Sequence, residues 1–507
     1  MLMLLIASVF LSIFVYFAWK GSYWQRHGVR GPRGWPLVGN MWSFITGRQH
    51  YGDVYQQIYN AYPELPYIGI YRLFGEPAIL LRSSEMIKEV MIRNFQHFQD
   101  NVLWVNPERD PVVTCNPFIA KGEKWRTMRN ELVPIFTPNK VKSSFPHIEN
   151  VCRKLMAHVN ENMKTNCFEA KDLFSKYTLD VIASSAYGLD GQTFTNTNSD
   201  FTTLVEHIFM PNPYSLLDSV VLLFSPTLGN LIKYTYFPKN VANWLHSIIM
   251  NILSLRLDKE EKEETKCLEK IEHSDFIQWL IENKRKQNEP VDKATIVGHC
   301  STFLLEGFET SSSLMAFALY QYAINPLEQQ KVLNEIDEVL KRYDGKLCYE
   351  ALQEMSYLEA TMYETLRLHA PMMALLKHCT KSFELPAQHR GGQSFWVPEG
   401  MVCIVPVKAV HYDPDIYANP LSFQPERFMD DKDKRPPCSF LGFGEGPRMC
   451  PGGRFGLAQS KAGIVSVLSK YSVHVADKAQ GKPLKIAPTT FLTAAENGIW
   501  IKFKERA

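Results

Sequence analysis

The segment from Phe443 to Gly452 reads FGEGPRMCPG and sets a single cysteine, Cys450, in a loop rich in glycine. Directly after it, apolar residues recur at helical spacing. They include Leu457, Ala458, Ala462, Val465 and Leu468. We therefore expect the sulfur of Cys450 at the N-terminus of a helix, where the positive end of the helix dipole favours a thiolate over a thiol.

The residues around the cysteine are suited to a flat ligand. Gly444, Gly446 and Gly452 carry no Cβ atom, so the backbone can approach such a ligand closely. Arg448 is a permanent cation that matches a carboxylate on that ligand. A lone cysteine is ordinarily a small buried hydrophobic residue, and only this context argues for a ligand.

The pattern Phe-x-x-Gly-x-Arg-x-Cys-x-Gly resembles the haem-binding loop of the cytochrome P-450 monooxygenases. In that family the cysteine thiolate is the proximal ligand of the haem iron and favours O–O cleavage. The resemblance implies haem b held through Cys450, with Phe443 and Arg448 at the cofactor. It also implies a mostly helical fold with a small β-rich lobe (α+β), and insertion of one oxygen atom from O₂ into an apolar substrate.

Composition agrees with a large folded enzyme and excludes several other classes. The 507 residues are 45% hydrophobic and 21% charged, which is enough apolar material for a large core. A net charge of +2 offers no electrostatic reason to bind nucleic acid. The ten cysteines form no C-x-x-C pair, so zinc, iron–sulfur and disulfide frameworks lack their usual spacing.

The N-terminal segment is predicted to hold the protein in a membrane. Leu2 to Trp19 is an apolar run broken only by two serines, long enough to cross a bilayer. The basic residues Lys20, Arg26, Arg30 and Arg33 follow it and should stay cytosolic. We predict a transmembrane signal anchor over residues 1–20, with the catalytic body on the cytosolic face of the endoplasmic reticulum. A cleaved signal peptide is the alternative, but this segment lacks the N-terminal positive charge and the small-x-small cleavage site that such a peptide has.

Residues 21–40 are basic and rich in proline and glycine, which predicts a stiff hinge similar to the proline-rich hinge of the family. The haem-thiolate monooxygenase domain is then expected over residues 41–507. Near its start, two β-like runs at 67–73 and 78–82 are joined by Phe74-Gly75-Glu76-Pro77, a pattern typical of a hairpin.

Trp125 and Arg129 lie one turn apart on a predicted helix. By themselves they make an amphipathic surface patch. Because they match the W-x-x-x-R element of the family, the resemblance implies that both contact a haem propionate.

Residues 293–324 form one long helical pattern without caps, and Glu306 to Ser311 lies inside it. Glycine and hydroxyl groups in a buried helix favour a local break. The segment resembles the oxygen-binding motif of the family, which implies that Thr310 and Glu309 are catalytic and relay protons during oxygen activation. The alternative is that Thr310 bonds its own helix and Glu309 is solvated.

Glu306 departs from the motif, which normally has a small residue there. A carboxylate beside a haem face is costly unless it is used or paired. The fatty-acid ω-hydroxylase branch of the family also carries this glutamate, esterified to a haem methyl. We therefore predict a Glu306–haem ester.

Glu364 and Arg367 lie on a predicted helix, and Arg427 follows in the sequence Pro-Glu-Arg-Phe. The first two could be only a surface ion pair. Their resemblance to the E-x-x-R and P-E-R-F elements implies a buried charged triad that supports the cysteine loop and has no catalytic role.

Residues 371–376 are expected to line the pocket, as the resemblance implies, and Lys377 follows where relatives usually carry arginine. Lys377 is thus the candidate for that propionate contact, as a point charge. The isolated His299 and His411 are interpreted as satisfied core or surface residues. The apolar stretch from 209 to 250 is core by default, whereas the resemblance implies a substrate-channel lid that touches the membrane.

No segment has the strand and spacing of a dinucleotide-binding fingerprint, so NADPH electrons must arrive from outside. The resemblance implies NADPH–cytochrome P-450 reductase, with cytochrome b5 as a second candidate. Basic residues are expected to dock it beside the cysteine, unless they only aid solubility: Lys124, Lys432, Lys434 and Arg435.

Details such as Phe308 to Ser312 are most similar to the insect microsomal group, associated with detoxification of xenobiotics and hormone metabolism. The substrate class stays open among xenobiotics, steroids, terpenoids and fatty acids. Two other functions also stay open. One is a haem-thiolate isomerase or dehydratase acting on peroxides, and the other is a non-catalytic haem sensor.

Overall fold

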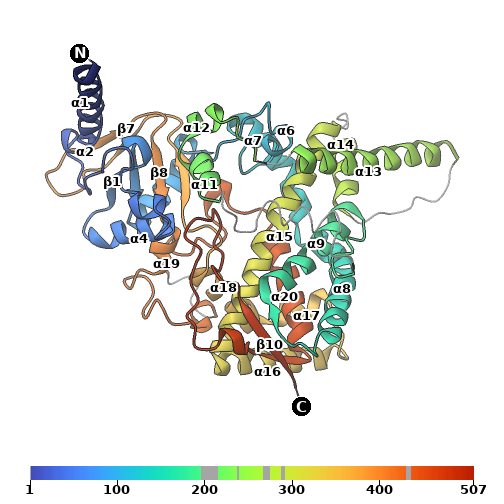
Figure 1. Cartoon of the computed structure of the whole chain (residues 1–507). Coiled ribbons are helices and arrows are strands. Elements are labelled where there is room, and N and C mark those ends of the chain that lie inside the picture. Colours follow the sequence, from blue (N-terminus) through green and yellow to red (C-terminus); the bar gives the residue numbers. More distant parts are fainter. Residues whose placement is uncertain are drawn as a thin grey trace.

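The computed structural model describes residues 2–195, 215–236, 239–266, 275–286, 292–429 and 435–506. Helices dominate it, and the strands gather in small sheets, as the α+β prediction requires (Figure 1). The largest sheet lies in a lobe at the N-terminal end of the chain, beside the helical body.

This sheet has five strands in the order β1-β2-β8-β5-β3. They are β1 (Tyr67–Tyr71), β2 (Pro77–Leu81), β8 (Val402–Val405), β5 (Leu375–His378) and β3 (Asp100–Asn101). β1 and β2 pair antiparallel, with Tyr67 opposite Leu81, which confirms the predicted hairpin. β5 lies between β8 and β3, so both of its edges are bonded.

The helical body is built around α15 (Lys293–Ile324), whose bounds are those predicted. Its apolar residues occur on nearly every face, as expected for a helix surrounded by protein. α15 packs against α9 (Ala170–Tyr187), α20 (Gly453–Leu468) and α18 (Ser356–Leu368). The predicted local break is not found, since α15 is one continuous helix through Gly307 and Thr310.

The other elements surround these two parts. The α-helices are α2 (Tyr23–Arg26), α3 (Trp42–Ile45), α4 (Tyr51–Ala61), α5 (Ser84–Lys88), α6 (Pro111–Thr114), α7 (Gly122–Leu132), α8 (Pro138–Glu161), α11 (Ser215–Leu223), α12 (Pro226–Leu231), α13 (Lys239–Lys266), α14 (Phe276–Lys286), α16 (Pro326–Arg342), α17 (Tyr349–Glu354) and α19 (Val407–His411). The short helical turns are η1 (Leu73–Gly75), η2 (Glu89–Arg93), η3 (Phe95–His97), η4 (Val133–Phe136), η5 (Pro425–Phe428), η6 (Gly446–Arg448) and η7 (Asp477–Ala479). The remaining strands are β4 (Phe168–Glu169), β10 (Trp500–Glu505) and β9 (Tyr471–Val475) in one sheet, and β6 (Phe383–Leu385) with β7 (Phe395–Val397) in another.

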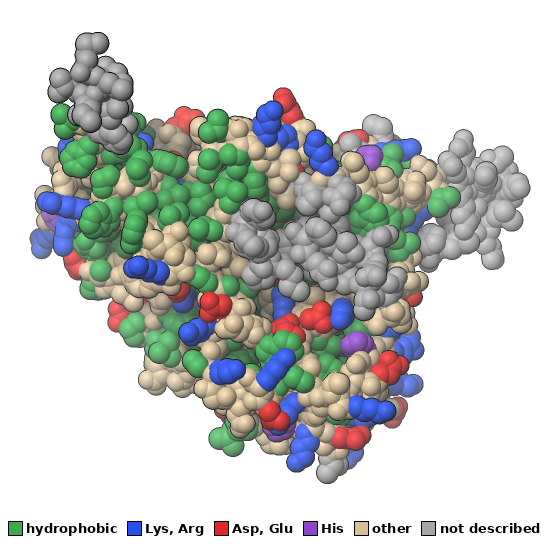
Figure 2. All heavy atoms as spheres, viewed as in Figure 1, with side chains coloured by type: hydrophobic (Ala, Val, Ile, Leu, Met, Phe, Trp, Pro, Cys, Tyr) green, Lys and Arg blue, Asp and Glu red, His purple; other side chains and the backbone are tan. Residues whose placement is uncertain are grey.

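The N-terminal helix α1 (Leu2–Lys20) extends away from the body (Figure 1). The ammonium group of Lys20, at its end, donates to the carbonyl oxygen of Phe74 at 3.0 Å. Apolar side chains gather on the face of the β lobe below it (Figure 2). The exposed apolar residues of this part include Trp35, Leu37, Trp42, Phe74 and Trp396. Searching the described residues finds no helix with the length and apolar character needed to cross a membrane.

The predicted lid is described only in part, because residues 209–214 and 237–238 lie outside the described residues. Within it, Val220 to Phe224 is buried against the core, whereas Leu231 is exposed. The stretch therefore combines core and surface, and its role as a lid stays a prediction.

Candidate functional site

Cys450 lies immediately before α20, at the helix end that its sequence predicts. Its backbone amide donates to the carbonyl oxygen of Phe443 at 2.8 Å, which closes the loop on itself. Gly446 has φ +72°, and a Cβ atom there would lie 2.1 Å from the carbonyl oxygen of Met91. A glycine is thus required at Gly446 for the loop to pack against η2.

Opposing influences act on the pKa of the Cys450 thiol. Burial and, less strongly, the nearby Glu306 raise this pKa to about 11. The amide of Gly452 and the cation of Arg129 lower it, in the direction that the helix argument predicts. A cation bound at the sulfur would favour the thiolate further.

The Cys450 loop, α7 and α15 bring three ionisable groups close enough to act on one another. The side chain of Cys450 is accessible to solvent. Arg129 of α7 interacts electrostatically with both Cys450 and Glu306. Glu306 of α15 is itself buried, which raises its pKa to about 7, and it is hydrogen-bonded by Asn116.

Trp125 and Arg129 both lie on α7, as predicted, and both lie near the cysteine loop. Trp125 is buried, and the guanidinium carbon of Arg448 lies 4.3 Å from the centre of its ring. Arg129 interacts electrostatically with Cys450 and with Arg448. The two residues therefore border the site from adjoining positions.

Arg448 joins the cysteine loop to the segment that precedes α7. It forms an ion pair with Asp100 at 3.3 Å, and burial lowers its pKa to about 10. Its other donors are taken by the carbonyl oxygens of Gln99 at 2.8 Å, Pro117 at 2.8 Å and Ala120 at 2.9 Å.

Lys377 lies on β5 with a side chain only 3% exposed, and its ammonium group donates to the Oδ1 atom of Asn101 at 2.7 Å. Burial and the nearby Arg448 lower the pKa of Lys377 to about 7. Asp100 is the carboxylate that acts on both cations. Two buried cations sharing one carboxylate leave an excess of positive charge, which suits a ligand that carries carboxylates.

The predicted oxygen motif keeps Thr310 and Glu309 adjacent on α15 but gives them different partners. The hydroxyl of Thr310 donates to the carbonyl oxygen of Glu306 at 2.8 Å, within its own helix. Glu309 is 5% exposed and forms an ion pair with Lys171 of α9 at 2.7 Å. The alternative of a solvated Glu309 is thus wrong, whereas the helix bond of Thr310 is present.

α20 is fastened directly to this part of α15. The buried Gln459 donates to the carbonyl oxygen of Gly307 at 2.9 Å and to the hydroxyl of Ser311 at 2.7 Å. The helix that follows Cys450 is therefore held in register with the motif on α15. Sequence reasoning missed Gln459, because a lone glutamine carries no signal of its own.

The three residues of the predicted triad come together. Glu364 and Arg367 are both fully buried and share two hydrogen bonds, at 2.7 and 2.8 Å. The Nε atom of Arg427 lies 3.5 Å from the carboxylate of Glu364. The alternative of a surface ion pair is excluded by this burial.

His411, for which the sequence predicts a satisfied core or surface position, lies in the core with both ring nitrogens in contact with backbone groups. It is completely buried, and burial lowers its pKa to about 3. One ring nitrogen contacts the carbonyl oxygen of Arg367 at 3.0 Å, and the other accepts from the amide of Leu441 at 2.8 Å. His411 therefore connects the triad to the residues just before the cysteine loop, a connection that no pattern in the sequence indicates.

His299 also lies in the core, where its Nε2 atom is 2.6 Å from the carboxylate of Glu131. Lys284 of α14 pairs with the same carboxylate. This buried cluster links α7 to α15 and α14, and its hydrogen bonds to Glu131 hold the pKa of that carboxyl group below its ordinary value although burial acts to raise it.

The expected reductase surface is described in part. Lys124 is exposed on α7. The guanidinium carbon of Arg435 lies 4.3 Å from the centre of the Phe428 ring, while Lys432 and Lys434 lie outside the described residues.

Comparison with known proteins agrees with this geometry. The family model described as "Cytochrome P450" matches residues 29–501. The chain is 41% identical to "Probable cytochrome P450 308a1" of Drosophila melanogaster, with 100% of this chain and 99% of the relative covered. It is 32% identical to "Probable cytochrome P450 6a14" of the same organism, with 95% of each covered. "Probable cytochrome P450 28d1", also from Drosophila melanogaster, is 30% identical, with 99% of this chain and 98% of the relative covered.

Proposed function

The chain belongs to the cytochrome P-450 family, in its insect group, and we propose that it inserts one atom of O₂ into a hydrophobic small molecule with electrons from NADPH. As in the family, haem b is held through a cysteine thiolate. The observation that carries the proposal is the position of Cys450 in the loop before α20, within electrostatic reach of Arg129 and Glu306.

The residues present fit haem. Cys450 would supply the iron ligand, and the iron would supply a cation that favours its thiolate. Lys377 and Arg448 carry the excess buried charge that two propionates would balance, with Trp125 and Arg129 beside them. Phe443 would hold the loop around the sulfur, because its carbonyl oxygen accepts the backbone amide of Cys450 at 2.8 Å. When bound, haem supplies the binding and reductive activation of O₂.

We assign proton delivery to Thr310 and Glu309. The proposal is supported by their positions three and four residues after Glu306 on α15, which place them on the same side of the helix as Glu306. Lys171 holds the Glu309 carboxylate in place, and the Thr310 hydroxyl keeps free acceptor capacity while it donates to its helix.

We propose that Glu306 forms an ester with a haem methyl group, in which its carboxylate oxygen would take the place of one methyl hydrogen. This two-electron oxidation would draw on the same O₂ and NADPH electrons as the proposed activity. Burial raises the pKa of Glu306 to about 7, so part of the carboxyl groups are ionised at neutral pH, and the residue lies close enough to Cys450 to act on its pKa. Asn116 fixes its direction.

We also propose that residues 1–20 anchor the chain in the endoplasmic reticulum membrane, with 21–40 as hinge and 41–507 as a cytosolic catalytic domain. The support is the apolar sequence of this segment, its exposed side chains Leu11, Phe14, Val15, Tyr16 and Trp19, and the apolar surface below it (Figure 2). NADPH–cytochrome P-450 reductase, with cytochrome b5 as a second donor, would dock at the Cys450 side through Lys124 and its basic neighbours.

Reduction of the purified protein under carbon monoxide tests the assignment. The Soret band should appear at the red-shifted thiolate position. With purified reductase, NADPH and O₂ should then be consumed as an apolar substrate from a panel of terpenoids, steroids, fatty acids and plant toxins is oxidised. A band typical of nitrogen-ligated haem would overturn the proposal.

The same assay separates the two other functions. Product formation from a peroxide without reductase would instead show the isomerase or dehydratase. Haem binding without any turnover across the panel would show the sensor. The buried Glu309–Lys171 pair argues against both, because neither function requires proton delivery to O₂.

A further inference from the structure

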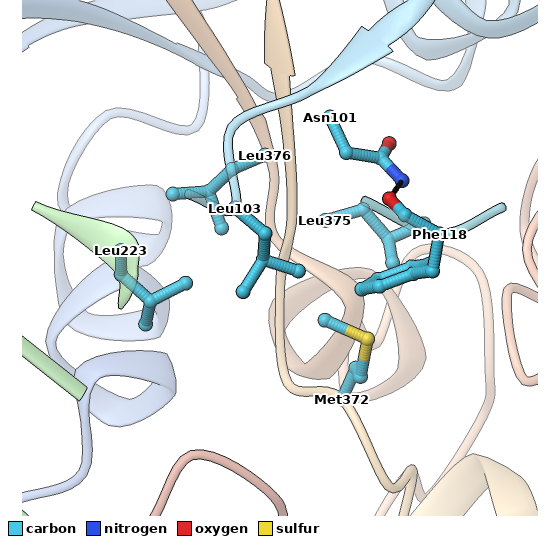
Figure 3. Close-up of a pocket in the computed structure, with 7 residues that line it drawn as sticks. All are labelled: Asn101, Leu103, Phe118, Leu223, Met372, Leu375 and Leu376. Carbon is cyan, nitrogen blue, oxygen red and sulfur yellow. Dashed lines mark hydrogen bonds between the residues drawn. The ribbon is translucent and has the colours of Figure 1, made fainter. Parts of the chain in front are cut away.

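Two hollows of very different size occur among the described residues. The one beside β5 has a volume of about 10 Å³, room for about one water molecule, and its lining includes Asn101 and Leu375 (Figure 3). The other is a surface groove of about 860 Å³, within the range of pockets that bind small molecules. This groove lies between the end of α15 and the sheet that contains β9 and β10. The proposed function makes no use of it.

Positive charge dominates the lining of the groove. Four lysines contribute to this lining and no aspartate or glutamate does: Lys478, Lys482, Lys485 and Lys502. Lys502 pairs with Asp477, which lies outside the lining, at 2.6 Å. The other three lysines form no ion pair within the described part of the chain. Three cations without counter-charges therefore border one groove.

The pairing of β9 with β10 adds to this positive field. His474 of β9 lies directly opposite Lys502 of β10. Burial lowers the pKa of His474, and the cations of Lys502 and Lys504 lower it further. The imidazole is therefore neutral at neutral pH, because protonating it would place like charges opposite each other. An anion bound in the groove would offset the field that these lysines create.

Aromatic and apolar side chains lie beside the cations. Tyr320 and Ile324 come from the end of α15, and Ile324 is exposed. Trp500 of β10 is half-buried, and its Nε1 atom donates to the carbonyl oxygen of Asn497 at 2.9 Å. The ammonium group of Lys478 lies over the Trp500 ring, an exposed contact that is weak enough for the ammonium group to move to an anion. A flat hydrocarbon body in the groove would remove this apolar surface from water.

The groove is remote from both the oxygen motif and α1. Tyr320 lies ten residues beyond Thr310 on α15, which corresponds to about 15 Å along the helix axis. β10 lies at the end of the body opposite α1 (Figure 1). A ligand would therefore reach the groove from water, and not from a membrane that holds α1.

We propose that this groove binds a soluble organic anion with a flat aromatic body, such as an aryl sulfate, an aryl phosphate or an aromatic carboxylate. Lys478, Lys482 and Lys485 would meet the anionic group, and Tyr320 and Trp500 would cover the ring. The anionic group and the ring should each contribute to affinity, because the groove offers partners for both. Binding does not depend on the proposed function, since none of these residues takes part in it.

Isothermal titration calorimetry of the full-length haem protein with 2-naphthyl sulfate tests the proposal. The haem pocket is first filled with 1-dodecylimidazole, a nitrogen ligand of iron, so that the aryl sulfate can bind only elsewhere. 2-Naphthol lacks the charge and inorganic sulfate lacks the ring, so each should bind at least about tenfold more weakly. Decyl sulfate carries the same charge on a flexible chain and should also bind about tenfold more weakly, because ordering the chain costs entropy.

Charge reversal identifies the groove as the site. Lys482→Glu and Lys485→Glu should each weaken binding of 2-naphthyl sulfate at least about tenfold, because an attractive contact becomes repulsive. Lys346→Glu reverses an exposed lysine that follows α16, outside the groove, and should leave the dissociation constant unchanged. Trp500→Leu keeps an apolar side chain without the flat ring, so it should weaken 2-naphthyl sulfate about tenfold but leave inorganic sulfate unchanged. Each variant should retain the wild-type carbon monoxide spectrum, which shows that it is folded.

Wild-type affinity in both Lys482→Glu and Lys485→Glu would overturn the proposal. Heat that disappears when 1-dodecylimidazole is added would overturn it as well, because the aryl sulfate would then lie in the haem pocket. Decyl sulfate that binds more tightly than 2-naphthyl sulfate would show a site for lipid-like anions and would contradict the aromatic ligand. The carbon monoxide spectrum reports thiolate-ligated haem separately, so failure of this proposal is distinguishable from failure of the proposed function.

Discussion

His411 accepts a hydrogen bond from the backbone amide of Leu441 at 2.8 Å, across 30 positions of the chain. The amide can only donate, so the other ring nitrogen must carry the proton and donate to the carbonyl oxygen of Arg367. The neutral histidine thus connects the buried triad to the start of the cysteine loop. This connection gives the triad a physical route by which it supports Cys450.

Acid should weaken the protein partly through His411. Its pKa is about 3 when folded and near 6.5 when unfolded, so between these values the unfolded chain binds a proton that the folded chain does not. The free energy of unfolding should therefore fall as the pH falls from 6.5 toward 3. His411→Gln should reduce this pH dependence by up to about 1.4 kcal/mol per pH unit, measured by urea unfolding. The exposed His389→Gln is the control, and identical slopes for all three proteins would contradict the role of His411.

Loss of one triad partner should be severe. Glu364→Gln leaves the fully buried Arg367 without its counter-charge and should lower the free energy of unfolding by about 3–5 kcal/mol. Arg427→Gln should cost less, because Arg427 is 3.5 Å from Glu364 and partly exposed. The yield of haem protein and the carbon monoxide difference spectrum measure both. If Glu364→Gln and Arg427→Gln lower the yield of haem protein equally, the distance of a residue from Glu364 does not determine how much stability its loss removes.

Thr310→Ala and Glu309→Gln should reduce product formation about a hundredfold, the size of effect expected for general acid–base groups, while NADPH is still consumed. Thr302→Ala is the matched control. Thr302 also donates to the carbonyl oxygen four residues earlier on α15, at 2.9 Å, but lies two turns away. If Thr302→Ala uncouples NADPH consumption from product as strongly as Thr310→Ala, the hydroxyl of Thr310 has only a structural role.

The Glu306–haem ester should survive acid denaturation. Solvent extraction should leave haem on the polypeptide, and its mass should exceed that of the bare chain by one haem. Glu306→Ala should release all haem, whereas Glu309→Gln should retain it. Free extraction from the wild type, with a polypeptide of unmodified mass, would rule out the ester.

In the Glu306→Ala background, where no ester holds haem, Lys377→Met should speed loss of haem about tenfold, because a buried charge-assisted contact to a propionate disappears. Lys377→Arg should retain haem at least as well as the wild type, since arginine supplies the same charge with a planar fork. Transfer of haem to excess apomyoglobin gives the rates. Lys381→Met, an exposed lysine just beyond β5, serves as control. No change in Lys377→Met would exclude the propionate contact.

Local patterns in the sequence predicted much of this molecule. The bounds of α15, the β1–β2 hairpin and the helix after Cys450 follow from hydrophobic periodicity and from glycine and proline at the turns. The pairing of Glu364 with Arg367 is local too, because residues three apart on a helix are neighbours. These features depend on spacing within one short segment, and the sequence by itself determines spacing.

The tertiary structure alone decided which groups are buried and which distant partners they meet. Arg72 reaches Leu223 across 151 positions, and His299 reaches Glu131 across 168. Burial, supplied by segments far apart in the chain, raises the pKa of Cys450 where its helix position alone predicted the reverse. The desolvation of a charge depends on everything packed around it, so no single stretch of sequence carries that information.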